Sequence, residues 1–135
     1  MNWPPDIIHV HGWMAALLPL YLKNIYSDEP IFQKSKIITS LYANEFNKPL
    51  NKKMIDKILF DEIDEKHIDK LKNPTYENLM KIAIDSSDAV IKGSENISSN
   101  INDYLKNYKN PILNFQPIDS FAEHYLDFYN NLLST

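Results

Sequence analysis

Residues 5–22 constrain the fold more than any other part of this sequence. They begin with a short apolar run over residues 7–11, turn at Gly12, and are then apolar on nearly every side from Trp13 to Leu22. An apolar run of about four to eight residues between turn signals is typical of a strand buried on both faces. Such strands belong to parallel sheets that helices cover. We therefore expect a parallel sheet with one strand ending at His11.

The rest of the chain alternates between strand and helix patterns. Strands are expected over 7–11, 36–42, 89–91 and 111–115, and helices over 13–24, 52–60, 64–71, 75–86, 98–108 and 120–133. Pro19 lies inside the first expected helix, where it should kink the helix or mark a tight contact. This alternation predicts an α/β fold, with three layers and about four parallel strands between helices, formed by residues 1–135 as one domain.

Composition narrows the possible partners. The formal charge of −4 disfavours nucleic acids and anionic membranes, and the longest apolar run falls well short of the ~20 residues that a membrane span needs. All fourteen basic residues are lysines, so the chain lacks the guanidinium group of arginine, which can bind phosphate through two parallel hydrogen bonds. It has no cysteine, which is compatible with the cytoplasm. We expect a cytoplasmic protein with no cofactor and no metal.

The first strand carries two histidines at its end. His9 and His11 are two residues apart, so both should lie on one face of the strand. In open parallel sheets, ligands bind beyond the carboxyl ends of the strands, which places His11 and Trp13 at a candidate site. A His-x-His pair after an apolar strand also fits a metal-dependent hydrolase that uses His9 and His11. That alternative needs a third ligand, from His67, His124 or an acidic residue.

The same stretch resembles a known family. The spacing of tryptophan, proline and histidine residues between Trp3 and Trp13 resembles the segment around the His-Asp-Trp motif of bacterial glycogen and starch synthases. The run that follows from Ala16, Ala-Leu-Leu-Pro-Leu-Tyr-Leu-Lys, is also similar to that segment. The resemblance continues through most of the chain. It is strongest to short relatives that hold the N-terminal synthase domain alone. The chain resembles the C-terminal half of that domain.

This resemblance implies the Rossmann-like N-terminal part of a GT-B glycosyltransferase. Its implied activity is the transfer of glucose from ADP-glucose to an α-1,4-glucan, so both compounds become expected partners. His11 and Trp13 match the outer positions of the motif that lines the sugar-nucleotide cleft, and we assign both as substrate-binding residues.

Several family positions are changed in this chain. Gly12 stands where the motif has aspartate, and Met14 replaces the polar residue that usually follows. Leu41 and Tyr42 stand where the family has histidine and asparagine, of which the histidine contacts the donor sugar. Leucine can neither donate nor accept a hydrogen bond. We therefore assign no catalytic residue and expect no transfer by this chain alone.

Two further expectations follow from these changes. A non-catalytic glucan-binding or assembly module is an alternative function, favoured by four tyrosines on which sugars could stack. These are Tyr104, Tyr108, Tyr125 and Tyr129. By the resemblance, the first strand lies centrally in the family's sheet, so here its outer edge should be open. We expect a second copy of the chain or a missing N-terminal half to cover that edge.

Overall fold

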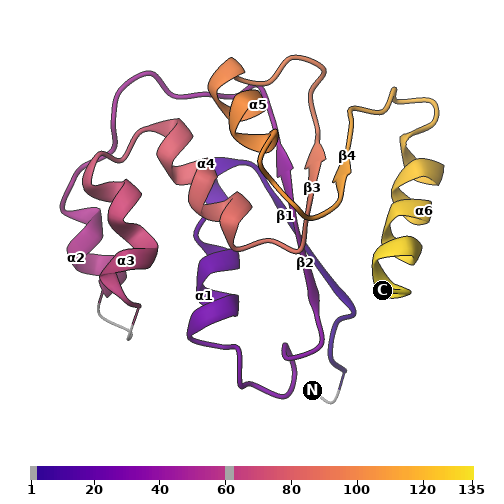
Figure 1. Ribbon diagram of the computed structural model, residues 1–135, viewed down its shortest axis with the longest axis horizontal. Helices are drawn as coiled ribbons and strands as arrows, with labels where there is room; N and C mark the ends of the chain where they lie inside the picture. Colours follow the sequence, from indigo (N-terminus) through magenta and orange to yellow (C-terminus); the bar gives the residue numbers. More distant parts are fainter. Residues whose placement is uncertain (1–2, 60–62) are drawn as a thin grey trace.

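A single parallel sheet organises the molecule. The computed structural model describes residues 3–59 and 63–135, and its four strands lie side by side in chain order, β1-β2-β3-β4 (Figure 1). The strands are β1 (Ile7–His11), β2 (Lys36–Leu41), β3 (Ala89–Lys92) and β4 (Ile112–Leu113). Every neighbouring pair is parallel. The predicted four-stranded parallel sheet is confirmed, although β4 has only two residues where five were expected.

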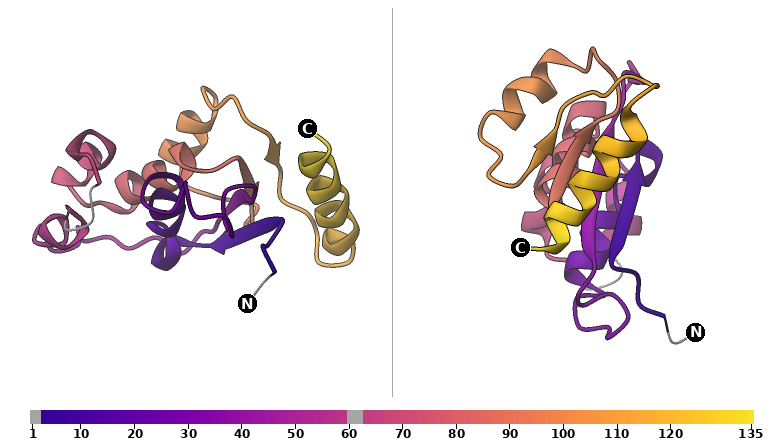
Figure 2. Two further views of the ribbon diagram at one scale, coloured as in Figure 1. Left: turned by 90° about the horizontal axis from the view of Figure 1, so that it is seen from below. Right: turned by 90° about the vertical axis from the view of Figure 1, so that its right-hand side faces the viewer.

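Helices cover both faces of the sheet, which confirms the three-layer prediction. The helices are α1 (Leu18–Asn24), α2 (Met54–Ile58), α3 (Glu65–Ile68), α4 (Tyr76–Asp85), α5 (Ser99–Leu105) and α6 (Phe121–Leu133), with 3₁₀ turns η1 (Trp13–Ala15) and η3 (Asp69–Lys72). The connections through α1, α4 and α5 lie on one face, as expected when right-handed crossovers join strands in sequential order. Of the helices in the described part of the chain, α6 alone lies against the opposite face (Figure 2).

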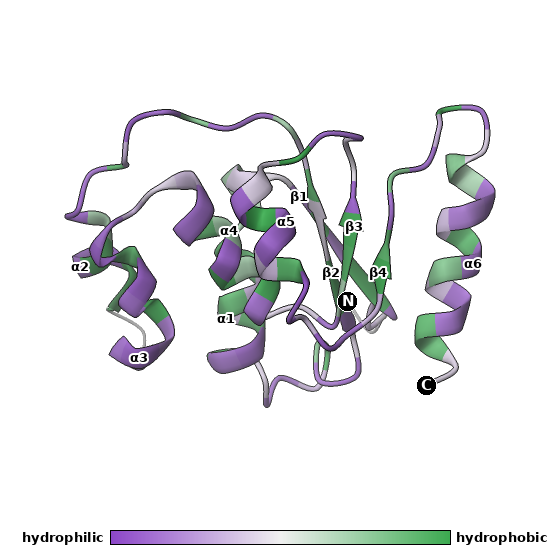
Figure 3. Cartoon of the chain, turned by 45° about the horizontal axis from the view of Figure 1, so that its top comes forward, coloured by the Kyte–Doolittle hydropathy of each residue, from purple (hydrophilic) through white to green (hydrophobic). Residues whose placement is uncertain are grey.

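The core lies mainly between the sheet and α4. Strand β3 is buried on both faces, because Ala89, Val90 and Ile91 are all fully buried. Val90 and Leu41 face α4 in the larger cluster, whereas Ala89 and Ile91 face α6 in a smaller one. Hydrophobic residues therefore run along the strands and recur along one side of α6 (Figure 3). Of the thirteen residues of α6, only Leu132 is buried.

The predicted continuous helix over residues 13–24 is wrong. A 3₁₀ turn (Trp13–Ala15) comes first, and α1 begins separately at Leu18. Pro19 does not kink a helix interior. It lies in the first turn of α1, where a backbone N–H would have no partner within the helix, so proline is accommodated there without loss.

The shorter helices are placed correctly but their ends differ. The helix expected over 52–60 is observed as Met54–Ile58, and its expected end at Phe60 lies outside the described residues. The helix expected over 64–71 is split into α3 and η3. Side chains cap α3 and α4, since Asp64 accepts a hydrogen bond from the Lys66 N–H and Thr75 accepts one from the Asn78 N–H.

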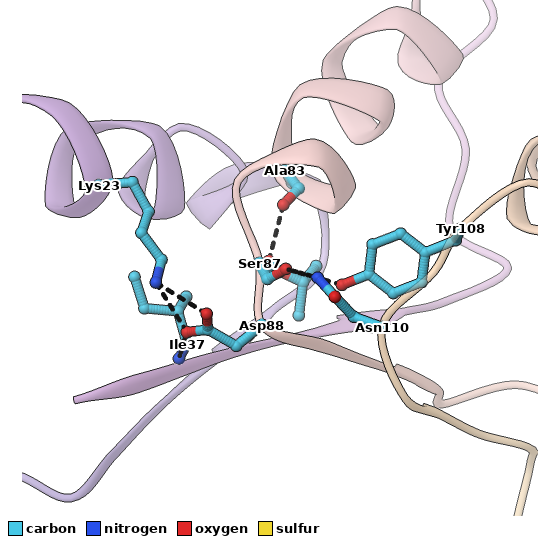
Figure 4. A network of polar contacts seen from close by, with 8 residues as sticks. Lys23, Ile37, Ala83, Ser87, Asp88, Tyr108 and Asn110 are labelled. Atoms are coloured by element: carbon cyan, nitrogen blue, oxygen red, sulfur yellow. Dashed lines mark hydrogen bonds and ion pairs between the residues drawn. The ribbon is translucent and has the colours of Figure 1, made fainter. Parts of the chain in front are cut away.

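A polar network fixes the amino end of β3 (Figure 4). The Asp88 carboxylate accepts hydrogen bonds from the Ile37 N–H at 2.7 Å and from the Lys23 ammonium at 2.8 Å. The Ser87 hydroxyl donates to the Ala83 carbonyl, so the 2.7 Å contact with Thr39 is a hydrogen bond that Thr39 donates. This network joins β2, β3, α1 and α4 at the edge of the sheet opposite to His11.

Strand β1 lies at one edge of the sheet. Strand β1 pairs with β2 alone within the described part of the chain, so its other edge has no strand partner there. No helix among residues 3–59 and 63–135 combines the length and the apolar character needed to cross a lipid bilayer.

Candidate functional site

His11 ends β1 at the carboxyl edge of the sheet. It is exposed, and its Nδ1 atom lies 2.8 Å from the Tyr42 hydroxyl. Gly12 follows with φ 67° and ψ −173°, and its N–H donates to the Ser40 carbonyl at 3.0 Å. This conformation is almost restricted to glycine. The chain can therefore leave the strand sharply after His11 while keeping one further hydrogen bond to β2.

His9 lies beneath His11 on the same face, as the spacing predicted. The centroids of the two imidazole rings are 4.1 Å apart. One ring nitrogen of His9 lies 2.7 Å from the Tyr129 hydroxyl of α6, and the other lies 2.7 Å from the Ser40 hydroxyl of β2. Burial, together with the neighbouring His11, lowers the pKa of His9 to about 4. His9 is therefore neutral near pH 7, with one nitrogen donating and the other accepting.

Beside His11 lies an open cavity of about 410 Å³. It lies between the carboxyl edge of the sheet and the segment that leads into α6. Its lining residues are His11, Tyr42, Gly93, Phe115, Gln116, Ile118, Phe121 and Tyr125. Because ligand sites in parallel sheets lie at this edge, the cavity is the candidate site.

Gly93 leaves room for the Tyr42 ring in this wall of the cavity. A Cβ atom at Gly93 would clash with the ring carbon Cε1 of Tyr42. The Tyr42 ring therefore occupies space that a side chain at position 93 would need. Glycine at this position thus allows Tyr42 to reach His11.

Trp13 and Leu41 lie on the face of the sheet opposite to the cavity. The Trp13 ring packs edge-to-face against Phe46 with centroids 5.0 Å apart, and both rings contact the larger core cluster. Leu41 belongs to that cluster and is 1% exposed. Thus, the structure brings His11 together with Tyr42, whereas Trp13 is not among the residues lining the cavity.

The geometry does not favour the metal alternative. Both nitrogens of His9 already contact hydroxyl groups. Within the described residues, no group of three or more histidine, cysteine, aspartate or glutamate side chains is arranged to hold a metal ion. His124, one of the expected third ligands, donates from Nδ1 to the Ser120 carbonyl on α6.

Part of the cavity wall was missed by the sequence reasoning. Phe115, Gln116, Ile118 and Phe121 follow β4, and Tyr125 is the one lining residue among the four tyrosines that the sequence suggests as sugar contacts. A usable signal existed, because these residues follow the carboxyl end of the fourth expected strand. Without knowing which face α6 covers, however, the sequence does not indicate that they approach His11.

The low pKa of His9 predicts a pH dependence of stability. The pKa is about 4 in the folded chain and 6.5 for an ordinary histidine, so the unfolded chain binds more protons between these values. The free energy of unfolding should therefore fall as the pH is lowered from 6.5 towards 4. Urea unfolding at several pH values measures this slope.

Two variants isolate the contribution of His9. His9→Gln removes the titrating group, and its slope in this pH range should be flatter than that of the wild type. His124→Gln changes an exposed histidine of α6 and should keep the wild-type slope. Equal slopes for His9→Gln and the wild type would show that His9 does not cause the dependence.

Known proteins resemble this chain over part of its length. The sequence matches the starch synthase catalytic domain family over residues 1–110. A glycogen synthase from Chlorobium luteolum is 36% identical over 63 residues, covering 47% of this chain and 13% of that protein. The same coverage with 38% identity is found for a glycogen synthase from Chlorobium phaeovibrioides.

A third relative matches a shorter stretch. A glycogen synthase from Thermotoga petrophila is 42% identical over 42 residues, which is 31% of this chain and 9% of that protein. The aligned stretches therefore span 13% or less of the length of these three relatives.

Proposed function

The chain belongs to the starch synthase catalytic domain family, and from this premise we propose that it recognises ADP-glucose and an α-1,4-glucan. The proposed place is the carboxyl edge of the sheet around His11 and Trp13, and the proposed location is the cytoplasm. The observation that carries this proposal is the open cavity beside His11. It lies at the edge where parallel α/β sheets bind ligands.

We further propose that the 135-residue chain does not transfer glucose by itself. Transfer needs a donor held in reactive geometry and cationic or hydrogen-bonding groups that stabilise the leaving diphosphate. The chain has no arginine, and Gly12 stands where the family motif has an acid. Leu41, at the position of the sugar-contacting histidine, is buried in the core.

Incubation of the purified chain with labelled ADP-glucose and glycogen tests this proposal. We expect no label in the glucan above background. Binding is followed separately in a Trp3→Phe variant, which leaves Trp13 as the only tryptophan, by titrating ADP-glucose and glycogen. A fluorescence change supports recognition near Trp13. Label in the glucan would contradict the proposed inactivity, and no binding of either compound to the folded chain in a calorimetric titration would contradict the proposed recognition.

A non-catalytic glucan-binding or assembly module is the second candidate. It is favoured by the burial of Leu41, which leaves no polar group at that family position. The two candidates differ in their response to the nucleotide. A module of this kind binds glycogen but gives no response to ADP-glucose in the same titration.

We also propose that the free edge of β1 is covered in the functional protein, by a second copy or by a preceding segment of the same protein. Unpaired strand edges promote association, and Met14 and Leu18 in the following segment are 82% and 41% exposed. Light scattering of the 135-residue chain should therefore detect dimers or larger species. A stable monomer at high concentration would contradict this proposal.

A further inference from the structure

A second open cavity lies at the amino edge of the sheet, opposite to His11. Its volume is about 390 Å³, and its wall is formed by the last turns of α1 and α4, by α3 and η3, and by the residues that lead into β3. Its charged residues are Lys23, Lys66, Lys70, Asp85 and Asp88. Three lysines thus face two aspartates, so the wall has an excess of positive charge in a chain whose formal charge is −4.

Both aspartates of this wall are already bound within the protein. The two carboxylate oxygens of Asp88 accept hydrogen bonds from Lys23 at 2.8 and 2.9 Å, and one of them also accepts from a backbone N–H of β2 (Figure 4). In Asp85, one oxygen accepts from the Tyr104 hydroxyl at 2.7 Å and the other from Lys70 at 2.8 Å. The wall therefore offers little to a cationic ligand, because its carboxylates are neutralised in place.

The lysines, in contrast, have donors left for a ligand. An ammonium group has three N–H donors. Lys23 uses two of them on its aspartate and Lys70 uses one. Lys66 pairs at 2.8 Å with Asp64, which is not among the residues lining the cavity, and both side chains are more than half exposed. Because such exposed pairs contribute little, Lys66 can exchange Asp64 for a ligand. Each lysine therefore keeps at least one N–H without an acidic partner in the described part of the chain.

Backbone acceptors in the same wall are also occupied. The Ser87 carbonyl accepts hydrogen bonds from the Tyr108 hydroxyl at 2.7 Å and from the Asn110 side chain at 3.1 Å. The Ile82 carbonyl, near the end of α4, accepts from the Ser86 N–H at 3.1 Å. A wall with occupied acceptors and unused cationic donors favours a ligand that is negatively charged and rich in acceptors. A phosphate group meets both requirements, and lysine binds it as a point charge.

We propose that this cavity binds a phosphate group through the ammonium groups of its three lysines. The site is separate from the cavity beside His11, and its assignment does not depend on the proposed function. An adjoining cavity of about 340 Å³ shares Asp85 and Asn110 with it and is lined by Tyr104 and Tyr108. The phosphate can therefore belong to a free ion or to a small monoester whose organic part lies beside these tyrosines.

Titration of the full chain at constant ionic strength tests this proposal, by calorimetry and by phosphorus NMR. The probes are sodium phosphate and phenyl phosphate, with sodium acetate as a singly charged comparison. At least one phosphate compound should bind saturably and more tightly than acetate. Lys66→Met and Lys70→Met should each weaken this binding by about two- to fivefold, as expected for the loss of one partly exposed charge contact. The effect of Lys70→Met should be the larger, since it also leaves Asp85 without its cation.

Lys106→Met is the matched control. Lys106 pairs with Asp103 at 2.7 Å, and its side chain is 74% exposed, compared with 71% for Lys66. It is not among the residues that line either cavity. The substitution changes the net charge by the same amount and should leave phosphate affinity unchanged. Circular dichroism and urea unfolding establish that each variant is folded under the conditions of the titration.

The outcomes decide between a built site and general attraction of anions. Tighter binding of sodium phosphate supports a site for the free ion, and tighter binding of phenyl phosphate supports a site for a monoester. The proposal is overturned if neither compound binds the folded chain saturably. It is also overturned if Lys66→Met and Lys70→Met bind as tightly as the wild type, or if Lys106→Met loses as much affinity as they do.

Discussion

Replacing Leu41 by histidine, the residue that the family has at this position, is expected to lower the free energy of unfolding by roughly 3–5 kcal/mol. Leu41 is 1% exposed and packs in the larger core cluster between the sheet and α4. The imidazole would lose the apolar contacts of leucine and bury two polar nitrogens among hydrocarbon side chains. Chemical unfolding followed by circular dichroism measures the change.

Leu41→Met is the matched control, since a swap that conserves volume and apolar character should cost less than about 1.5 kcal/mol. The Leu41→His variant should also show no glucosyl transfer, because a side chain at this position enters the core. A Leu41→His protein as stable as Leu41→Met would contradict the described packing. Appearance of transfer would contradict the placement of this side chain away from the substrate.

Restoring the acid of the family motif by Gly12→Asp is expected to destabilise the chain by about 1–3 kcal/mol. Space is not the obstacle, because a Cβ atom at Gly12 would lie at an ordinary 3.4 Å from Asn44. The cost arises from the backbone, whose φ of 67° and ψ of −173° strain any residue with a side chain. Thermal or urea unfolding measures it.

Met14→Asp introduces the same charge two residues later and serves as the control. Met14 is 82% exposed and belongs to a 3₁₀ turn, so its substitution should change stability by no more than about 0.5 kcal/mol. Gly12→Ala should resemble Gly12→Asp, since the strain comes from the Cβ atom. Stability of Gly12→Asp equal to that of Met14→Asp would contradict the described conformation.

The sequence predicted the sheet well because its strands carry strong local signals. The run around Ile38 is rich in β-branched residues, and Ala89 to Ile91 is short and wholly apolar, so burial on both faces follows from composition. The parallel pairing follows from the helices between the strands. The caps at Asp64 and Thr75 were predictable for the same reason, since each side chain bonds to a backbone N–H two or three residues later.

Helix boundaries and the cavity depended on information that local patterns lack. Pro19 fits a kinked helix and a helix start equally well in sequence, and tertiary packing decides between them. The positive φ of Gly12 is likewise not encoded by glycine alone, which adopts either sign. The proximity of Phe121 to His11 depends on which face α6 covers, and an amphipathic helix at this point in the chain can pack on either face.

Candidate residues inferred from the family fell on different sides of the sheet. His11 lines the cavity, whereas Trp13 packs with Phe46 against the larger core cluster. Sequence proximity did not reveal this separation, because the turn at Gly12 changes the direction of the chain between them. The assignment of both residues to substrate binding remains a proposal that the titrations above test.

Few side chains of α6 are buried, and this limits how long the cavity stays formed. Proteins open locally at different free energies, and segments with few buried side chains detach long before the sheet unfolds. Helix α6 has one buried residue, Leu132, and it contacts β1 mainly through the rings of Tyr125 and Tyr129, which lie against His9. Its amides should therefore exchange with solvent faster than those of β3, and each detachment removes Phe121 and Tyr125 from the wall. A bound ligand that bridges this wall and His11 would slow that exchange.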